Sequence, residues 1–345
     1  MANVLDIRRR IRSVRNTRQI TKAMKMISAA RLRRAQERAL SARPYAQMLT
    51  NVLKSLVSRA EIFDPETGEP RHPLLAERPE QTLLMIVVTG DRGLAGAFNA
   101  NIMKAATRFI AAKQGKKIDI EAVGRKGRDL LRRRFPVAKA ERQERAGAVQ
   151  LVGEHVGVLG KLQFSYVRDL AESVIDRYTN GEIDSVYVLY NEFKSVIAQR
   201  LVVEKVLPIE EIGEQAVSMA EELTKEQKEA HAEAARTAGV STERADTTEM
   251  DRHAAAFATA QVDYIYEQPP SELFRDLLPK YVTGQIYRSM LESVAAEHAA
   301  RMTAMDSATS NADEMIDKLT LAMNRARQAK ITKEIIEIVS GAAAQ

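Results

Sequence analysis

Three glycines that follow a strongly apolar stretch are the residues best placed to do chemistry. Gly90, Gly93 and Gly96 come directly after Leu83–Thr89 and precede a pattern typical of a helix. Phosphate-binding loops lie at such a junction between a strand and a helix. The spacing is G-x-x-G-x-x-G, however, and neither G-x-G-x-x-G nor Gly-Lys-Ser/Thr is present there. The favoured interpretation is a tight crossover without a bound nucleotide.

Other kinds of catalytic site have less support. Asp91 and Arg92 lie within the glycine turn, but no His or second carboxylate is near them, which favours a local cap or ion pair. The chain has no Cys, which excludes disulfides, thiolate metal sites and a Cys nucleophile. The histidines are scattered without metal-type spacing: His72, His155, His231, His253 and His298. The sequence therefore predicts no catalytic residue, no cofactor or cofactor-binding residue and no metal ligand.

The charge of the chain is concentrated at its N-terminus. Residues 1–43 contain 13 Lys and Arg against Asp6 and Glu37, a local charge of +11 in a chain whose net charge is +6. Such a segment predicts an anionic partner. It could be a targeting peptide, but the pattern runs beyond ordinary targeting length. Nucleic acid is the second alternative, yet no aromatic residue precedes Tyr45 and no nucleic-acid-binding motif is present.

Both ends of the chain have the pattern of long helices. Residues 3–58 contain no Gly, and Pro44 should bend or interrupt the helix. Two apolar stripes at helical spacing are Ile7, Ile11 and Val14, and then Ile20, Met24 and Ile27.

The C-terminal segment, from about residue 271 to 340, carries a heptad seam. Its members are Met305, Thr309, Ala312, Ile316, Leu319, Met323 and Ala326. A helix of roughly 70 residues would extend on the order of 100 Å. No domain of this size can bury it fully, so it must pair with the N-terminal helix, enter another protein, or do both.

Strands alternate with helices between the two long helices, which predicts a partly parallel α/β sheet. The expected strands are 83–89, 118–123, a weak 137–140, 185–190 and 198–207, with helices at 99–112, 127–134 and 156–179. The longest strongly apolar run, Leu83–Val88, is too short to span a membrane. Residues 210–252 carry 12 Asp and Glu against 5 Lys and Arg, which favours a solvated insertion outside the core.

Several separate segments, in the right order, resemble the gamma subunit of F-type ATP synthases. They are Asn16–Arg31, Thr89–Asn99, Tyr190–Ser195, Ala300–Met302, Asn324–Glu334 and Glu337–Ala342. The resemblance implies two long terminal helices in an antiparallel coiled coil, flanking a Rossmann-like, partly parallel α/β domain. The expected division is 1–60 (N-terminal helix), 61–80 (linker), 81–209 (α/β foot), 210–262 (acidic insertion) and 263–345 (C-terminal helix).

The resemblance also implies a function and partners. The chain would be a non-catalytic rotor shaft inside a ring of alpha and beta subunits. Its foot would bind the epsilon subunit and the membrane c-ring, on the cytoplasmic side of a bacterial inner membrane or the matrix side of an organellar one. No nucleic acid and no direct small-molecule substrate are expected.

Individual residues acquire expected roles from the same resemblance. Arg327 and Gln328 match a position that contacts a catalytic-subunit loop, and the tip would turn in an apolar collar. The residues expected to face acidic loops are Met24, Lys22 and Lys25, and those expected in the collar are Ile335, Ile338 and Val339. Residues 213–259 depart from the usual family pattern. This raises the hypothesis of a contact with epsilon, the c-ring or a regulatory partner at that segment, although a passive surface insertion is the favoured interpretation.

Overall fold

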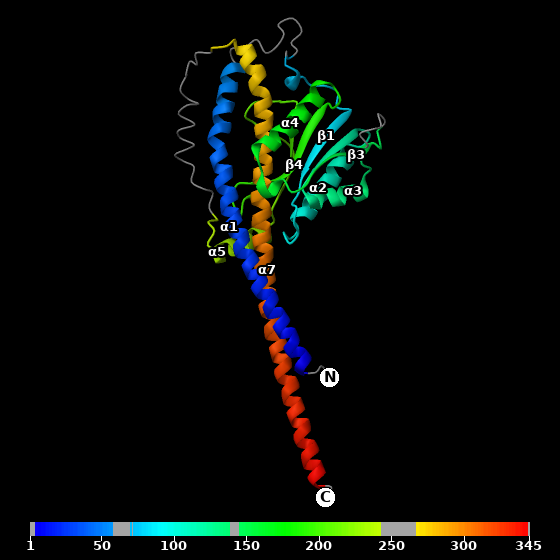
Figure 1. Cartoon of the computed structure of the whole chain (residues 1–345), viewed down its shortest axis with the longest axis vertical. Coiled ribbons are helices and arrows are strands. Elements are labelled where there is room, and N and C mark those ends of the chain that lie inside the picture. Colours follow the sequence, from blue (N-terminus) through cyan, green and yellow to red (C-terminus); the bar gives the residue numbers. More distant parts are fainter. Residues whose placement is uncertain (1–3, 58–69, 71, 139–144, 243–266, 344–345) are drawn as a thin grey trace.

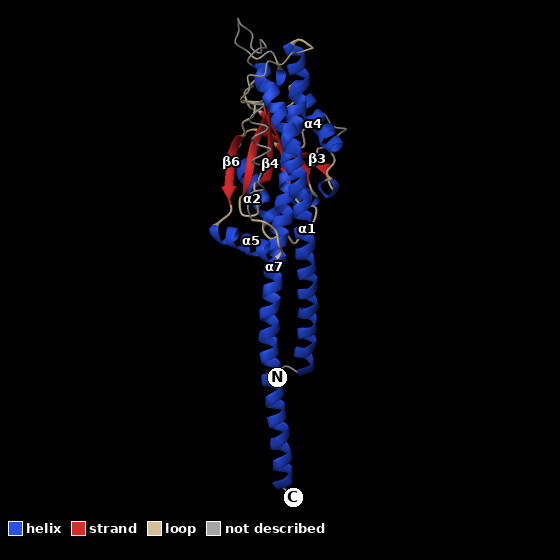
Figure 2. Cartoon of the chain, turned by 90° about the vertical axis from the view of Figure 1, so that its left-hand side faces the viewer, coloured by secondary structure: helices blue, strands red, loops and turns tan. Residues whose placement is uncertain are grey.

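The computed structural model describes residues 4–57, 70, 72–138, 145–242 and 267–343. The molecule is elongated: two long helices lie side by side, and an α/β domain packs against one end of the pair (Figures 1 and 2). The longer helix continues past the N-terminus of the other and ends alone at the far end of the molecule (Figure 1).

Eight helical segments and six strands make up the described part of the chain. The helices are α1 (Val4–Val57), α2 (Phe98–Ala112), α3 (Arg125–Arg134), α4 (Phe164–Thr179), α5 (Lys225–Thr237) and α7 (Pro270–Ala343), with short 3₁₀ turns at Pro73–Leu75 and Leu159–Lys161. The strands are β1 (Thr82–Val88), β2 (Lys117–Val123), β3 (Val149–His155), β4 (Ser185–Phe193), β5 (Gln199–Leu207) and β6 (Ala216–Glu222).

The six strands form one mixed sheet in the order β3-β2-β1-β4-β5-β6. The pairs β3/β2, β2/β1 and β1/β4 are parallel, whereas β4/β5 and β5/β6 are antiparallel. The parallel half, with its crossover helices, confirms the Rossmann-like, partly parallel fold that the sequence predicts. A continuous apolar run such as β1 suits this position, because a central parallel strand is covered on both faces.

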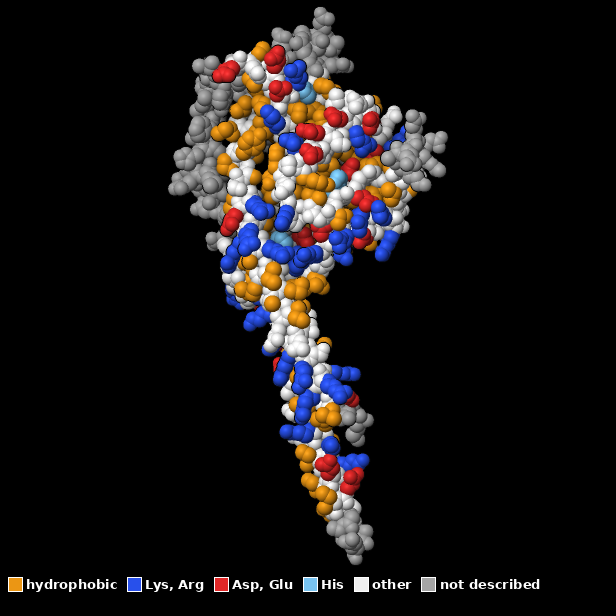
Figure 3. Space-filling view, in the orientation of Figure 1, with side chains coloured by type: hydrophobic (Ala, Val, Ile, Leu, Met, Phe, Trp, Pro, Cys, Tyr) orange, Lys and Arg blue, Asp and Glu red, His pale blue; other side chains and the backbone are white. Residues whose placement is uncertain are grey.

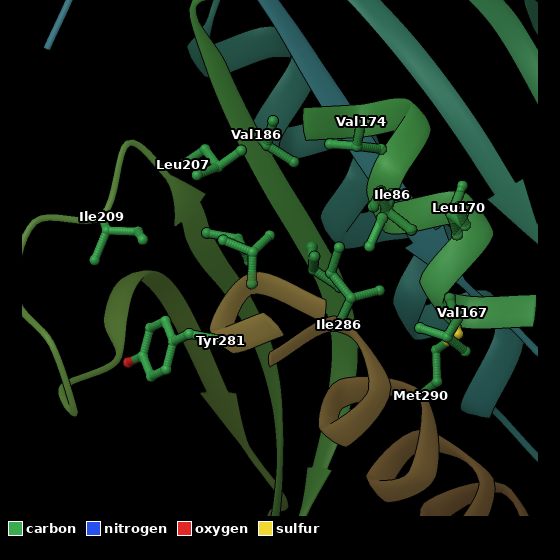
Figure 4. Packing of buried hydrophobic residues seen from close by; sticks show 14 of the residues in the cluster. Ile86, Val167, Leu170, Val174, Val186, Leu207, Ile209, Tyr281, Ile286 and Met290 are labelled. Carbon is green, nitrogen blue, oxygen red and sulfur yellow. The ribbon is translucent and has the colours of Figure 1, made fainter. Parts of the chain in front are cut away.

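Alternate residues of β1 pack into two cores, one on each face of the sheet. Ile86 lies in the first core with side chains of α4 and of α7, among them Val167 and Ile286 (Figure 4). Met85 lies in the second core, where α2, α5 and the next part of α7 pack. Both long helices contribute to both cores, so the shaft is built into the domain and is not merely appended to it.

Beyond the α/β domain, α1 and α7 cover each other in antiparallel orientation. Ile7 and Ile11 are buried against Ile316, with Leu319 and Met323 packed beside them. The heptad seam of the C-terminal helix is therefore confirmed. Within the described ranges, no helix combines the length and hydrophobicity that a membrane span requires.

Polar pairs join the middle of the two helices, where the seam also buries Met305 and Ala312. Thr21 and Thr309 share a hydrogen bond of 2.8 Å between their hydroxyls. One turn closer to the domain, the buried ammonium of Lys25 lies 2.5 Å from a carboxylate oxygen of Asp306. One turn farther away, Arg18 lies 2.7 Å from Asp313. The expected second stripe is wrong, because Ile20, Met24 and Ile27 do not form the seam: Ile20 and Ile27 are 60% and 53% exposed, and Met24 is only half-buried.

The observed elements differ from the expected ones at three places. Helix α1 continues through Pro44, so the interruption allowed for at this residue does not occur; the packing of Leu49, Leu53 and Leu56 in the first core holds the following turns in place. The third strand is β3, later in the chain than expected, and Val137 makes only an isolated bridge to it; residues 139–140 of the expected strand lie outside the described residues. Helix α4 begins at Phe164, not at 156.

The acidic segment after β5 is largely structural, which corrects the expectation that it lies outside the core. Residues 216–222 form β6 at the edge of the sheet. In α5, His231, Ala234 and Ala235 are buried, and the two alanines belong to the second core. The expectation for residues 243–262 falls outside the described residues.

We expect Lys25→Met to lower the free energy of unfolding by about 1–2 kcal/mol, because it leaves the carboxylate of Asp306 without its cation. Urea unfolding of the purified chain measures this. Arg9→Met is the matched control on the same helix, since the Arg9–Asp6 pair is long (3.9 Å) and exposed. Equal effects of the two substitutions would contradict the structural role of Lys25.

A second expectation concerns acid pH. Burial lowers the pKa of His231 from 6.5 to about 4. As pH falls, the unfolded chain therefore binds this proton first, and stability is lost between pH 6.5 and 4. Because His231→Gln removes this titrating group, the free energy of unfolding of the variant should fall by up to about 3 kcal/mol less than that of the parent over this pH range. Unfolding measured at several pH values in this window tests it; the same slope in variant and parent would refute the assignment.

Candidate partner-binding surfaces of the two long helices

The last turns of α7 project beyond any other described element. Every residue from 331 to 340 is exposed. The exposed fractions of Ile335, Ile338 and Val339 are 55%, 72% and 62%. These are the three residues that the sequence predicts for an apolar collar, and the structure places them together at the free end.

This free end is amphipathic. Ile331, Ile335 and Ile338 follow at spacings of four and three, so they lie on one side of the helix. Two ion pairs accompany them, Lys330–Glu334 at 3.6 Å and Lys333–Glu337 at 3.5 Å. A row of large apolar side chains in water is costly and typically marks a surface that another molecule covers.

The remaining predicted residues occupy two separate levels of the shaft. Lys22 is exposed and Met24 half-buried, on the part of α1 that faces residues 306–309 of α7. Arg327 and Gln328 are exposed much farther along α7, just past the last residue that packs against α1. The structure therefore does not bring these two groups together.

Lys25 has a different place from the one expected. Its side chain is buried, and its ammonium also donates a hydrogen bond of 2.7 Å to the hydroxyl of Thr237, at the end of α5. The cation is thus already used within the chain, and it fixes α1, α7 and α5 to one another. Lys22, which is exposed, is the better candidate for an external acidic loop.

The glycine turn after β1 packs against α7. A Cβ on Gly90 would lie 2.8 Å from the carboxyl group of Glu297, and Gly96 has a φ of +54° beside Ala304. Arg301 is buried, pairs with Glu297, and donates hydrogen bonds of 3.3 Å to the carbonyl of Gly93. Helix α7 therefore packs directly on the turn, which requires a glycine at position 90, and the backbone conformation favours one at position 96.

Glu297 and Arg301 hold α7 against the glycine turn, and the sequence did not indicate this role. The only signal was an opposite-charge pair four residues apart in an Ala-rich stretch, and such pairs are usually exposed. Here both are buried, and burial raises the pKa of Glu297 despite the nearby Arg301.

A second polar cluster joins α7 to the sheet. Arg288 donates hydrogen bonds of 2.7 and 3.0 Å to the carboxylate of Glu204 on β5, which also accepts one of 2.6 Å from Tyr190 on β4. Burial raises the pKa of the neighbouring Glu292 to about 7. Buried groups of this kind have few alternative partners, so they fix the rotation of α7 on the sheet.

Comparisons with known proteins agree with this architecture. Residues 3–345 match a family described as ATP synthase. The chain is 48% identical over 344 residues to the ATP synthase gamma chain of Solibacter usitatus, covering 100% of this chain and 99% of the relative. It is 42% identical over 347 residues to that of Anaeromyxobacter sp. strain Fw109-5, with coverage of 100% and 99%.

The two alignments run along the whole of both chains, so these relatives carry a segment of comparable length to residues 213–259.

Solved structures share the fold at low sequence identity. A chain of the Euglena gracilis mitochondrial ATP synthase (OSCP/F1/c-ring) aligns with a TM-score of 0.56 and 17% identity, covering 99% of this chain and 94% of that one. A chain of the Tetrahymena thermophila mitochondrial ATP synthase (central stalk/c-ring) gives a TM-score of 0.50 and 21% identity, with coverage of 84% and 99%. With its full-length match to the family and to these relatives, the chain belongs to the gamma subunits of F-type ATP synthases.

Proposed function

We propose that this chain is the central-stalk rotor of a proton-driven F-type ATP synthase. It transmits torque from the c-ring to the catalytic ring and sets the conformations of the catalytic sites in turn, without catalysing the reaction itself. The observation that carries this proposal is the free end of α7, an exposed amphipathic helix that no described part of the chain covers.

The shaft is asymmetric, which is what the mechanism requires. Near the domain it consists of two helices joined by polar pairs, whereas at the tip only α7 remains (Figure 2). Turning such a body inside a ring of alpha and beta subunits presents a different surface to each catalytic subunit. A surface that contacts one conformation better than another shifts the population of that subunit toward it.

Two kinds of contact with the ring follow from the exposed residues. Lys22, Arg327 and Gln328 provide polar contacts to acidic or polar loops of the catalytic subunits, in keeping with the positive charge of α1. The apolar tip turns within an apolar collar. Because apolar contact is non-directional, the tip can be held in place without a strong angular preference.

The α/β domain is proposed as the foot that contacts the epsilon subunit and the c-ring. The titles of the structural relatives name a c-ring beside their stalk or F1 part, which supports this end of the assembly. The chain would thereby be a peripheral membrane protein on the cytoplasmic side of a bacterial inner membrane. A regulatory partner at residues 213–259 stays a hypothesis, and the packing of 216–240 favours a structural role for that part.

We expect that replacing the tip residues, in the variant Ile335→Gln/Ile338→Gln/Val339→Gln, will lower ATP synthesis by the reconstituted complex at least about tenfold. The reason is the loss of apolar burial in the collar. The unfolding midpoint of the purified chain should not change, because these side chains are exposed.

Lys330→Gln/Lys333→Gln is the control for this experiment, since these exposed side chains lie on the same turns of α7 but outside its apolar row. It should change the rate of synthesis less than about twofold. Full activity of the triple tip variant would overturn the proposed contact.

A further inference from the structure

A cavity of about 580 Å³ lies where the shaft passes the α/β domain. Its walls are α1, α7 and the loops that follow β1, β2 and β3, represented by Asp91, Arg125 and Gly157. These loops all lie at the carboxyl ends of parallel strands. Ligands of open α/β sheets bind at this edge, and 580 Å³ is within the range of small-ligand pockets.

Arginine is the dominant residue of this cavity. Six arginines line it: Arg31, Arg34, Arg38, Arg92, Arg125 and Arg301. The first three are spaced by three and four residues on α1, so they present guanidinium groups from one side of that helix. In Figure 3, Lys and Arg side chains gather at the level where the domain meets the shaft.

Most of these guanidinium groups have no anionic partner. Within the described part of the chain, Arg301 is the only one of the six in an ion pair, with Glu297. The other acid at the cavity, Asp91, already accepts backbone N–H bonds of 3.0 Å from Arg125 and from Gly157. Five arginines thus line the cavity without an ion-pair partner, and the carboxylate of Asp91 beside them is already hydrogen-bonded to backbone N–H groups.

The histidine at this cavity carries no charge at pH 7. The pKa of His298, which also lines the cavity, is lowered to about 4, first by burial and then by the charges of Arg301 and Arg31. The imidazole is therefore neutral at pH 7 and cannot relieve or add to the charge. Gathering several cations without counterions costs free energy, which a bound anion would recover.

Another part of the cavity wall is apolar, which favours an anion that also has a less polar part. Leu159, Leu162, Leu291 and Val294 form this part of the wall. A ligand with a compact, multiply charged end and a less polar remainder fits both parts. The walls come from three loops and two helices of a single chain, which favours a small molecule over a segment of another protein.

We propose that this cavity binds a small molecule carrying two or more linked phosphates, as an effector and not as a substrate. Guanidinium groups pair with phosphate oxygens in a bidentate manner, so Arg34 and Arg38 are the main ligands on the α1 side. The glycine turn itself takes no part, because α7 occupies it. The inference does not depend on rotation of the shaft.

Isothermal titration of the full-length chain with pyrophosphate and with ATP, both without Mg²⁺, tests the proposal. We expect binding by the parent chain and an affinity at least about tenfold weaker in Arg34→Gln/Arg38→Gln. The matched control is Arg12→Gln/Arg15→Gln, which removes the same charge from exposed positions of α1 outside the cavity and should change the affinity less than about twofold.

The affinities of the two probes distinguish a phosphate site from a nucleotide site. Equal affinities for pyrophosphate and ATP would support a site for the phosphates alone, and tighter binding of ATP would support a nucleotide. No binding of either probe at about millimolar concentration, or equal weakening in both double variants, would overturn the proposal. Thermal unfolding with and without pyrophosphate provides the independent check, since a ligand of the folded state should raise the midpoint of the parent and of Arg12→Gln/Arg15→Gln more than that of Arg34→Gln/Arg38→Gln.

Discussion

The rest of the structure depends on the antiparallel pairing of α1 and α7. A helix of 74 residues is far too long for its own domain to bury, so most of its apolar seam needs a second helix. The N-terminal helix supplies it. Where the pairing ends, the exposed row of apolar side chains on α7 begins. This uncovered apolar surface is the part of the chain best suited to contact another subunit.

Polar groups determine how the two helices align. A seam of small and aliphatic residues tolerates sliding, because apolar contact has no preferred direction. The hydroxyl pair of Thr21 and Thr309 and the ion pair of Lys25 and Asp306 are satisfied in one register only. Arg301 and Glu297, and then Arg288 and Glu204, fix α7 to the sheet in the same way. These contacts join the shaft to the α/β domain, as the proposed transmission of torque requires.

Sequence reasoning succeeded where one physical signal was dominant. The continuous apolar run of β1 indicated a buried parallel strand, and the heptad of Met305 to Ala326 indicated a paired helix. It failed where polar residues form the helix contact. Ile20 and Ile27 have the spacing of a buried stripe but are exposed, whereas Thr21 and Lys25 are buried against α7. The length of the C-terminal helix indicated that part of it lies outside its own domain, but the residues of the free end were identified only through the family resemblance. The contacts of Glu297 and Arg301 with the glycine turn became apparent only in the structure.

The acidic segment shows a different limit. Strand β6, at the edge of the sheet, is only half-buried: Val217 packs against the first core and Met219 against the second. Helix α5 packs through alanines, which carry little hydrophobic signal. Composition therefore indicated a solvated insertion, although the local spacing already permitted both elements.

The pairing can be tested most directly by joining the two helices covalently in the assembled complex. The chain has no Cys, so the variant Thr21→Cys/Thr309→Cys would place the only two thiols of this subunit where hydroxyl groups now lie 2.8 Å apart. The measurement is the rate of ATP synthesis before and after oxidation. Our account predicts that the disulfide forms and that synthesis continues at its former rate, because the helices keep this register while the shaft turns. Failure of the disulfide to form, or loss of synthesis that reduction restores, would contradict it.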